Sequence, residues 1–207
     1  MQFGLYLLSI GIVLFSQMLI TNQYKKYRAI DIESGLTGYD VAKRILESNN
    51  LAQVDVVMQE KGVLSDFYDP KSNTVSLSPS VYNDSSVASI AIAAHECGHA
   101  IQYATGYKII GVRNRIMPLA IASSNLSIFL IIAGLILSSS LVGQMLVTIG
   151  LVMFGIVAVF QLVTLPIEFN ASSRALALLQ TYPDITEDEL DGSKSMLKAA
   201  AFTYVAS

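Results

Sequence analysis

Three long apolar segments constrain the fold of this 207-residue chain more than any other feature. They cover residues 3–20, 117–137 and 141–165, and a helix needs about 20 apolar residues to cross the core of a bilayer. With 53% hydrophobic and only 14% charged residues, the chain is too apolar for an ordinary soluble domain. We therefore predict a mainly α-helical membrane protein with three transmembrane helices.

The order of charges around these segments predicts their roles. Basic residues follow the first segment instead of preceding it, and no A-x-A-like cleavage site is present, so residues 1–20 are expected to form an uncleaved anchor instead of a signal peptide. The other two segments are separated only by three serines, which predicts a transmembrane hairpin over residues 117–165.

Basic residues near the ends of membrane spans mark the cytoplasmic side. Here they all fall on one side: Lys25, Lys26, Arg28, Lys108, Arg113, Arg115 and Arg174. We expect a multi-pass protein of the cell membrane in which residues 21–116 and 166–207 share the cytoplasmic face.

The part outside the membrane is predicted to be a small α+β domain. Residues 37–50 have helical spacing, and residues 54–78 contain short apolar runs broken near 60–62 and 69–73, which predicts a three-stranded antiparallel sheet. N-cap residues at 83–86 and Gly106 bound a further helix at about 85–105.

The C-terminal region, residues 166–207, is predicted to be helical. Pro166 suits the first position of a helix, Thr186 and Glu189 form a capping box, and a break is expected near Gly192 with a second helical stretch from Ser193. Residues 199–207 resemble the start of another apolar segment, so we expect that a fourth span has been lost or cut away.

Charge and cysteine content exclude some classes of function. The net charge of −3 comes without a long basic run, so no nucleic-acid partner is expected. One cysteine, Cys97, cannot form an internal disulfide.

Both histidines of the chain lie in the predicted helix at 85–105. His95 and His99 are four positions apart, about 40° of rotation, so their imidazoles project from one face and can reach one ion. Glu96 lies beside that face, where it can act as a general base on a water held by the metal. Two unpaired imidazoles bring no benefit to an apolar helix, so we favour one Zn²⁺ over coincidence.

Catalytic zinc takes three protein ligands and leaves a position for water. Cys97 points about 200° away from His95 and is expected to be a small buried residue. Glu168 emerges from an apolar span, where a carboxylate is costly unless it is paired or bound. We favour Glu168 as the third ligand, and the alternative is an interfacial carboxylate stabilised by the helix dipole. Small residues near it and near the histidines permit two helices to pack closely.

Asp191 offers a different interpretation. His95, Glu96 and His99 form the pattern His-Glu-x-x-His (HExxH). Leu190-Asp191-Gly192 matches the aspartate motif that accompanies this pattern in site-2-type intramembrane proteases. Asp191 here lies in a strongly acidic stretch instead of an apolar helix, so this alternative is disfavoured.

The segments AAHECGHAIQ (93–102), LSPSVY (77–82) and LPIEFNASSRAL (165–176) resemble the YugP-like family of putative neutral zinc metallopeptidases of bacterial membranes. The third segment is also similar to the second motif of HtpX-type and CAAX-prenyl-type membrane proteases. These resemblances imply a zincin-like catalytic region over residues 21–116, metal binding by His95, His99 and Glu168, and catalysis by Glu96. Asn170 and Ser172 stand where the related patterns usually have aspartates.

These patterns together predict a membrane-embedded zinc metalloendopeptidase that acts on peptide or protein substrates at the bilayer. The alternative is a membrane-anchored metal-binding scaffold or an inactive protease-like binding module. A strand at 74–78 is a candidate edge for peptide binding. Four residues are candidates for stabilising the oxyanion: Tyr82, Tyr204, Arg174 and Arg113.

Overall fold

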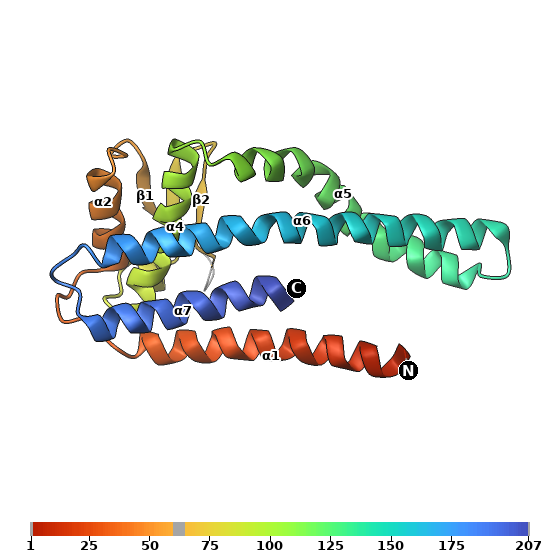
Figure 1. Cartoon of the computed structure of the whole chain (residues 1–207), viewed down its shortest axis with the longest axis horizontal. Coiled ribbons are helices and arrows are strands. Elements are labelled where there is room, and N and C mark those ends of the chain that lie inside the picture. Colours follow the sequence, from red (N-terminus) through yellow and green to blue (C-terminus); the bar gives the residue numbers. More distant parts are fainter. Residues whose placement is uncertain (1, 60–64, 207) are drawn as a thin grey trace. The chain divides into compact units, whose positions relative to one another are not determined.

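The computed structural model describes residues 2–59 and 65–206, without the side chains at positions 2–10, 12, 13 and 202–206. The protein is mainly helical with one small sheet (Figure 1). In chain order the elements are α1 (Gln2–Arg28), α2 (Gly38–Ser48), β1 (Asp55–Met58), β2 (Phe67–Asp69), β3 (Thr74–Leu77), α3 (Pro79–Tyr82), α4 (Val87–Ala104), α5 (Lys108–Ile136), α6 (Leu141–Leu179) and α7 (Glu187–Ala206). They form two compact units, Met1–Gly106 with Glu168–Ser207, and Tyr107–Ile167.

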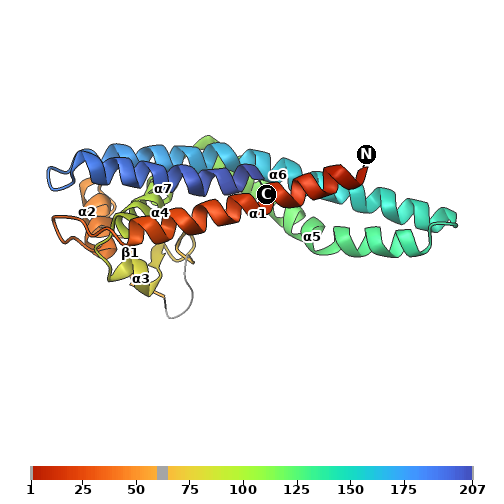
Figure 2. The same ribbon diagram turned by 90° about the horizontal axis from the view of Figure 1, so that it is seen from below.

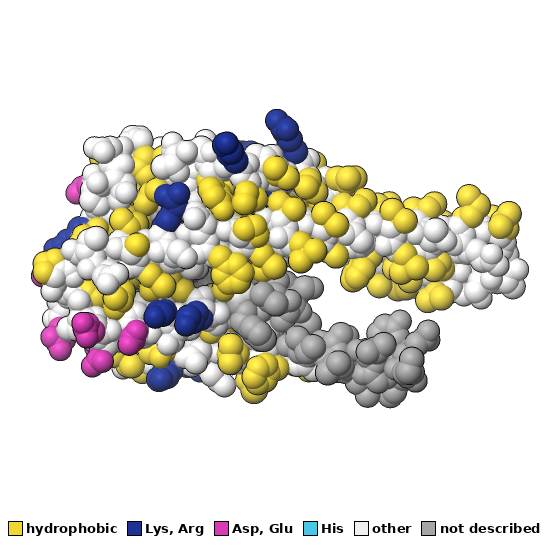
Figure 3. Space-filling model, viewed as in Figure 1, with side chains coloured by type: hydrophobic (Ala, Val, Ile, Leu, Met, Phe, Trp, Pro, Cys, Tyr) yellow, Lys and Arg dark blue, Asp and Glu magenta, His cyan; other side chains and the backbone are white. Residues whose placement is uncertain are grey.

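The second unit is an antiparallel pair made by α5 and the first part of α6. The two helices have 29 and 39 residues and are long and apolar enough to cross a membrane. Their large side chains point outward, with Phe129 67% and Leu141 74% exposed. Hydrophobic side chains accordingly cover much of the visible face of this pair in Figure 3.

Glycines bring the two helices of this unit close together. A Cβ atom on Gly134 would lie 2.7 Å from the carbonyl oxygen of Gly143, and one on Gly150 would lie 2.6 Å from the Ile131 side chain. Small residues at such contacts are typical of helices that pack in a membrane, where van der Waals contact replaces the hydrophobic effect between helices.

Two helices of the described chain, not the three that we expected, qualify as membrane spans. The remaining expected span, residues 1–20, lies in α1. Most side chains of that segment, at positions 1–10, 12 and 13, are outside the described residues.

Pro166 does not begin a new helix, contrary to our expectation. Helix α6 runs through it without interruption. Proline removes one backbone hydrogen bond, but membrane helices tolerate this loss when neighbouring groups satisfy the freed carbonyls. Sequence alone cannot separate a helix that starts at a proline from one that passes through it.

In the first unit, α4 lies at the centre of the apolar core and contacts α1, α2, α3 and α7. Its N-cap is Ser86, whose hydroxyl accepts a hydrogen bond from the Ser89 amide at 3.3 Å. Helix α2 begins with a capping box between Thr37 and Asp40, which confirms the helix expected near residues 37–50.

The sheet is mixed, so the prediction of an antiparallel sheet was wrong. Its order is β1-β3-β2, with β1 parallel and β2 antiparallel to β3. The predicted turn at 69–73 joins β2 to β3, whereas the one at 60–62 lies outside the described residues. Alternation of side chains identifies strands but not their partners. Strand β3 lies in the middle because it has the most deeply buried side chains, Val75 and Leu77.

Helix α7 packs along α1, as both views show (Figures 1 and 2). The capping box of Thr186 and Glu189 is confirmed, and the buried Glu189 carboxylate also accepts a hydrogen bond from the Glu33 amide at 2.7 Å. The expected break at Gly192 is absent because this glycine serves packing: a Cβ there would meet Val87 and Tyr27 at 2.9–3.1 Å.

Helix α4 approaches the last turns of α6 closely at Gly98. A Cβ atom at this position would lie 2.6 Å from the carbonyl oxygen of Ala171. Ala171 and Ala175 are fully buried, so small residues on both helices let the two backbones touch.

We predict that Gly98→Ala destabilises the protein by roughly 1–3 kcal/mol, because backbone atoms of α6 cannot move aside for a methyl group as a flexible side chain would. The measurement is the melting temperature of the detergent-solubilised protein, followed by circular dichroism. Gly111→Ala, where the new Cβ meets nothing within 4 Å, is the matched control. Equal melting temperatures for the two variants would contradict the prediction.

Candidate metal centre

Helix α4 presents two imidazoles on one face. His95 and His99 are one turn apart, with ring centroids separated by 4.8 Å and ring planes at 85°. Both side chains are largely buried, with 15% and 17% of their surface exposed. The spacing of four residues therefore has the geometric result that we expected from the sequence.

Helix α6 brings the Glu168 carboxylate to these rings. Glu168 Oε2 lies 3.3 Å from His95 Nε2 and 3.6 Å from His99 Nε2. This oxygen is buried and has no hydrogen-bond partner in the described part of the protein. A buried carboxylate oxygen is costly unless positive charge lies beside it, and a metal ion held together with the two imidazoles would supply that charge.

The three side chains fit the requirements of a metal ion. Their candidate ligand atoms all lie within 4.8 Å of one another, so they could hold one ion together. Ligands at about 2.0–2.2 Å from a tetrahedral zinc are separated from each other by about 3.3–3.6 Å. The two distances from Glu168 Oε2 agree with that separation.

The close contact at Gly98 explains how Glu168 reaches the histidines. Gly98 precedes His99 on α4, and Ala171 is one turn past Glu168 on α6, so the backbone contact lies directly beside the three side chains. A larger residue at either position would move the carboxylate away from the imidazoles.

Ser172 holds the other nitrogen of the His95 ring. Its hydroxyl oxygen lies 3.1 Å from His95 Nδ1. With Nδ1 hydrogen-bonded in this way, the ring is oriented with Nε2 toward Glu168. The serine at the position where an aspartate was expected thus still contacts His95, one of the candidate ligands.

A chain of three polar side chains holds the His99 ring. Arg174 Nε donates to Asn170 Oδ1 at 2.9 Å, and Gln102 Nε2 donates to the same oxygen at 3.0 Å. The opposite end of the Gln102 amide, Oε1, lies 3.0 Å from His99 Nδ1. Because arginine can only donate, the chain fixes the orientation of both amides and places the proton on His99 Nδ1, which leaves the Nε2 lone pair for a metal.

Glu96 lies beside the three side chains instead of among them. The buried Glu96 carboxylate accepts a hydrogen bond from the Tyr68 amide of β2 at 3.1 Å. Burial raises the pKa of Glu96 above its usual value, the two imidazoles oppose this effect, and the charges of Glu168 and Asp66 add to it. A carboxyl group with a raised pKa is suited to accept and return a proton near neutral pH.

The negative charges of the neighbouring carboxylates favour a positive charge at or beside the His99 ring. Burial by itself would lower the pKa of His99, but contact with Glu168 and the charge of Glu96 outweigh it and raise the pKa to about 9. The same charges would attract a divalent ion.

A cavity of about 220 Å³ lies beside the candidate metal centre. His95, Glu96 and Glu168 lie in its wall, and most of the remaining lining is apolar, including Ile20, Ile92, Met196 and Leu197. A mainly apolar cavity with a few converging polar groups is typical of a substrate-binding site.

Asp66 is a polar residue of this cavity that sequence reasoning missed. Its carboxylate accepts hydrogen bonds from the Ser78 amide at 2.6 Å and from the Ser78 hydroxyl at 3.3 Å. Burial raises the pKa of Asp66. No spacing or motif connects Asp66 to the histidines, so only the path of the chain before β2 places it here.

Other residues considered from the sequence lie away from the cavity wall. Cys97 is buried, and its thiol donates to the Ala42 carbonyl at 3.6 Å, as expected of a packing residue. Asp191 is exposed on α7 and borders a separate cavity.

The oxyanion candidates have other environments. Tyr82 packs on Tyr39 with ring centroids 4.8 Å apart, Arg174 binds Asn170, and the Arg113 guanidinium lies over Phe160. The Tyr204 side chain is outside the described residues.

The proposed peptide-binding edge at 74–78 was wrong. Strand β3 is paired on both sides and has no free edge, because it is the central strand. Strand β2 is at an edge, and its Tyr68 amide points to Glu96.

Comparisons with known proteins agree with this geometry. The profile of a family described as "putative neutral zinc metallopeptidase" matches residues 3–207. The chain is similar to "Putative membrane protease YugP" of Bacillus subtilis (strain 168), with 37% identity over 199 residues that cover 96% of this chain and 86% of that protein. No solved structure matches the chain.

We predict that Asn170→Ala weakens the affinity for a divalent metal by about 10- to 100-fold, because Gln102 then loses the partner that orients it toward His99. Competition with a chromogenic chelator measures this affinity without any substrate. Asn170→Asp, which keeps the acceptor oxygen, should bind within a few-fold of the wild type. If the alanine variant binds as tightly as the aspartate variant, the chain of hydrogen bonds does not support the metal site.

Proposed function

Because this chain belongs to the family described as "putative neutral zinc metallopeptidase", we propose that it is a zinc-dependent metalloendopeptidase of the cell membrane. In this proposal His95, His99 and Glu168 hold one Zn²⁺ in a zincin-like site, and Glu96 is the general base. The observation that carries the proposal is the buried Glu168 oxygen, which faces Nε2 of both histidines and lacks a hydrogen-bond donor in the described part of the chain.

Zinc in such a site lowers the pKa of a bound water to about 7 and polarises the carbonyl group of the substrate. The residues of the protein provide the remaining steps. Glu96 accepts the proton of the attacking water on a carboxylate oxygen and returns it to the nitrogen of the leaving amine. The Tyr68 amide holds the Glu96 carboxylate in position during both transfers.

The surroundings of the site support this chemistry. Ser172 and Gln102 hold the Nδ1 atoms of the two rings, so neither imidazole can rotate its Nε2 away. The mainly apolar wall of the cavity lowers the local polarity and thereby strengthens the charge interactions beside it.

The proposed location is the membrane. Two helices are long and apolar enough to span it, and the similar Bacillus subtilis protein is named a membrane protease. We propose that α1 supplies a further span and that the site faces the cytoplasm, because the basic residues flank the spans on that side. Membrane-associated peptides or proteins are the proposed substrates.

We predict that Glu96→Gln lowers the rate of hydrolysis of an unfolded protein substrate by about 10²- to 10⁴-fold, since the amide cannot accept a proton. Bound zinc, measured by atomic absorption, should be unchanged because Glu96 is not a ligand. Glu47→Gln, at an exposed position of α2, is the matched control and should keep full activity. Zinc bound by both wild type and Glu96→Gln, with hydrolysis by neither, would indicate the scaffold alternative.

Glu168→Ala tests the third ligand. The purified variant should lose most of its zinc, because two imidazoles on one helix hold the ion far more weakly than three ligands. Glu187→Ala, at an exposed position of α7, should retain about one zinc per chain. Full zinc occupancy in the Glu168→Ala protein would exclude Glu168 as a ligand.

A further inference from the structure

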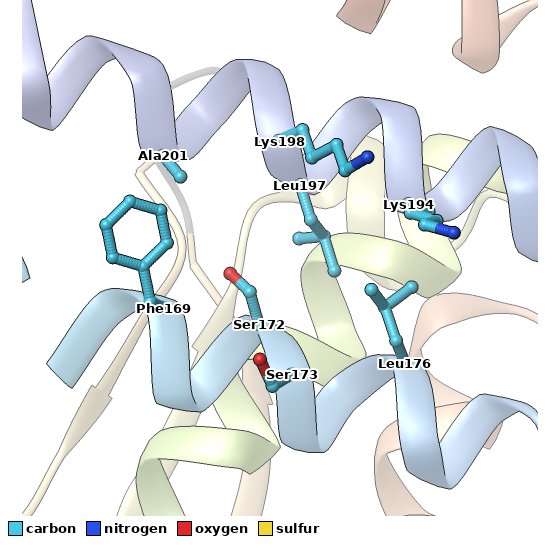
Figure 4. Close-up of a pocket in the computed structure, with 8 residues that line it drawn as sticks. All are labelled: Phe169, Ser172, Ser173, Leu176, Lys194, Leu197, Lys198 and Ala201. Atoms are coloured by element: carbon cyan, nitrogen blue, oxygen red, sulfur yellow. The ribbon is translucent and has the colours of Figure 1, made fainter. Parts of the chain in front are cut away.

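A second, more open cavity adjoins the metal centre. It is a groove of about 340 Å³ between the last turns of α6 and the middle of α7 (Figure 4). Its apolar walls include Phe169 and Leu176 from α6 and Leu197 and Ala201 from α7. We refer to it as the α6–α7 groove.

The α6–α7 groove is continuous with the cavity that contains Glu96. Ser172, Leu197 and Ala201 line both of them. Ser172 is also the residue whose hydroxyl contacts His95 Nδ1. An extended chain with one residue in the metal cavity therefore has a direct path into the groove.

Two lysines border the same groove. Lys194 and Lys198 are one turn apart on α7, both are exposed, and no carboxylate pairs with either of them in the described part of the protein. Lys194 also lines the neighbouring cavity that contains Glu187 and Asp191, whereas Lys198 does not. Lysine can cover an apolar surface with its methylene groups while its ammonium group binds an anion.

We propose that the α6–α7 groove binds an apolar segment of the peptide substrate and that Lys194 and Lys198 hold an acidic side chain or terminal carboxylate of that segment. This inference rests on the proposed peptidase function and adds a substrate class to it. A peptide is favoured over a lipid as the occupant because the groove leads into the cavity where hydrolysis would occur.

The test uses the full-length protein with zinc and a series of fluorescent peptides. Each peptide consists of leucine and alanine with a single glutamate, glutamine or lysine. For Lys194→Gln/Lys198→Gln we expect KM for the glutamate peptide to rise about three- to tenfold, since each exposed ion pair contributes modestly. Values of kcat, the zinc content and the kinetics on the glutamine peptide should remain within twofold. Lys71→Gln, in the exposed turn before β3, is the matched control.

Charge reversal gives a sharper result. Lys198→Glu should reverse the preference, so that the lysine peptide binds more tightly than the glutamate peptide. Fluorescence anisotropy with the same substitution in Glu96→Gln protein measures this binding without hydrolysis. The test of the groove therefore remains decisive even if the wild type cleaves none of the peptides, a result that would count against the peptidase function alone.

Three results would overturn the proposal. One is unchanged discrimination between glutamate and glutamine peptides in both lysine variants. Another is the absence of any such discrimination in the wild type. The third is lysine-dependent binding of short-chain phosphatidylglycerol together with equal binding of all peptides, which would identify a lipid site instead.

Discussion

The contact between Gly98 and Ala171 is the constraint on which the site depends. Glu168 lies on α6, 69 or more positions after the two histidines of α4 in the sequence, so no local structure can bring it to them. A backbone contact that leaves no room for a Cβ atom at Gly98 holds the two helices at the separation that places the Glu168 carboxylate 3.3–3.6 Å from both Nε2 atoms. Gly98, the glycine of the HECGH segment, therefore helps to position the candidate ligands.

The groups that hold the histidines are neutral where they touch the rings. A hydroxyl contacts His95 and an amide contacts His99, and the positive charge of Arg174 lies three hydrogen bonds away from His99, beyond Asn170 and Gln102. Carboxylates in these positions would make the imidazoles more basic. Neutral partners fix the orientation of the rings without adding negative charge to a cavity that already contains Glu96 and Glu168.

Sequence reasoning succeeded where local geometry or a large energetic cost was decisive. Helical spacing placed the two histidines on one face, and the cost of a carboxylate at the end of an apolar span singled out Glu168. It failed where tertiary contacts decide between local options. Pro166 lies inside a continuous helix, Gly192 packs against Val87 and Tyr27, and β3 is paired on both sides. Asp66 joins the site through folding alone, so no pattern in the sequence identified it, whereas Gln102, three positions after His99 on α4, could have been found from helical spacing.

The charges of the site connect metal binding to the packing of the helices. Glu96 and Glu168 are two buried carboxylates in one cavity, and burying such charges costs several kcal/mol each unless they are compensated. The charges of Glu168 and Glu96 also raise the pKa of His99, so the surroundings of this imidazole favour positive charge. In the proposed enzyme one divalent ion compensates both carboxylates and binds side chains from α4 and α6 at once. The ion and the contact at Gly98 then stabilise the same arrangement of the two helices, so each strengthens the other.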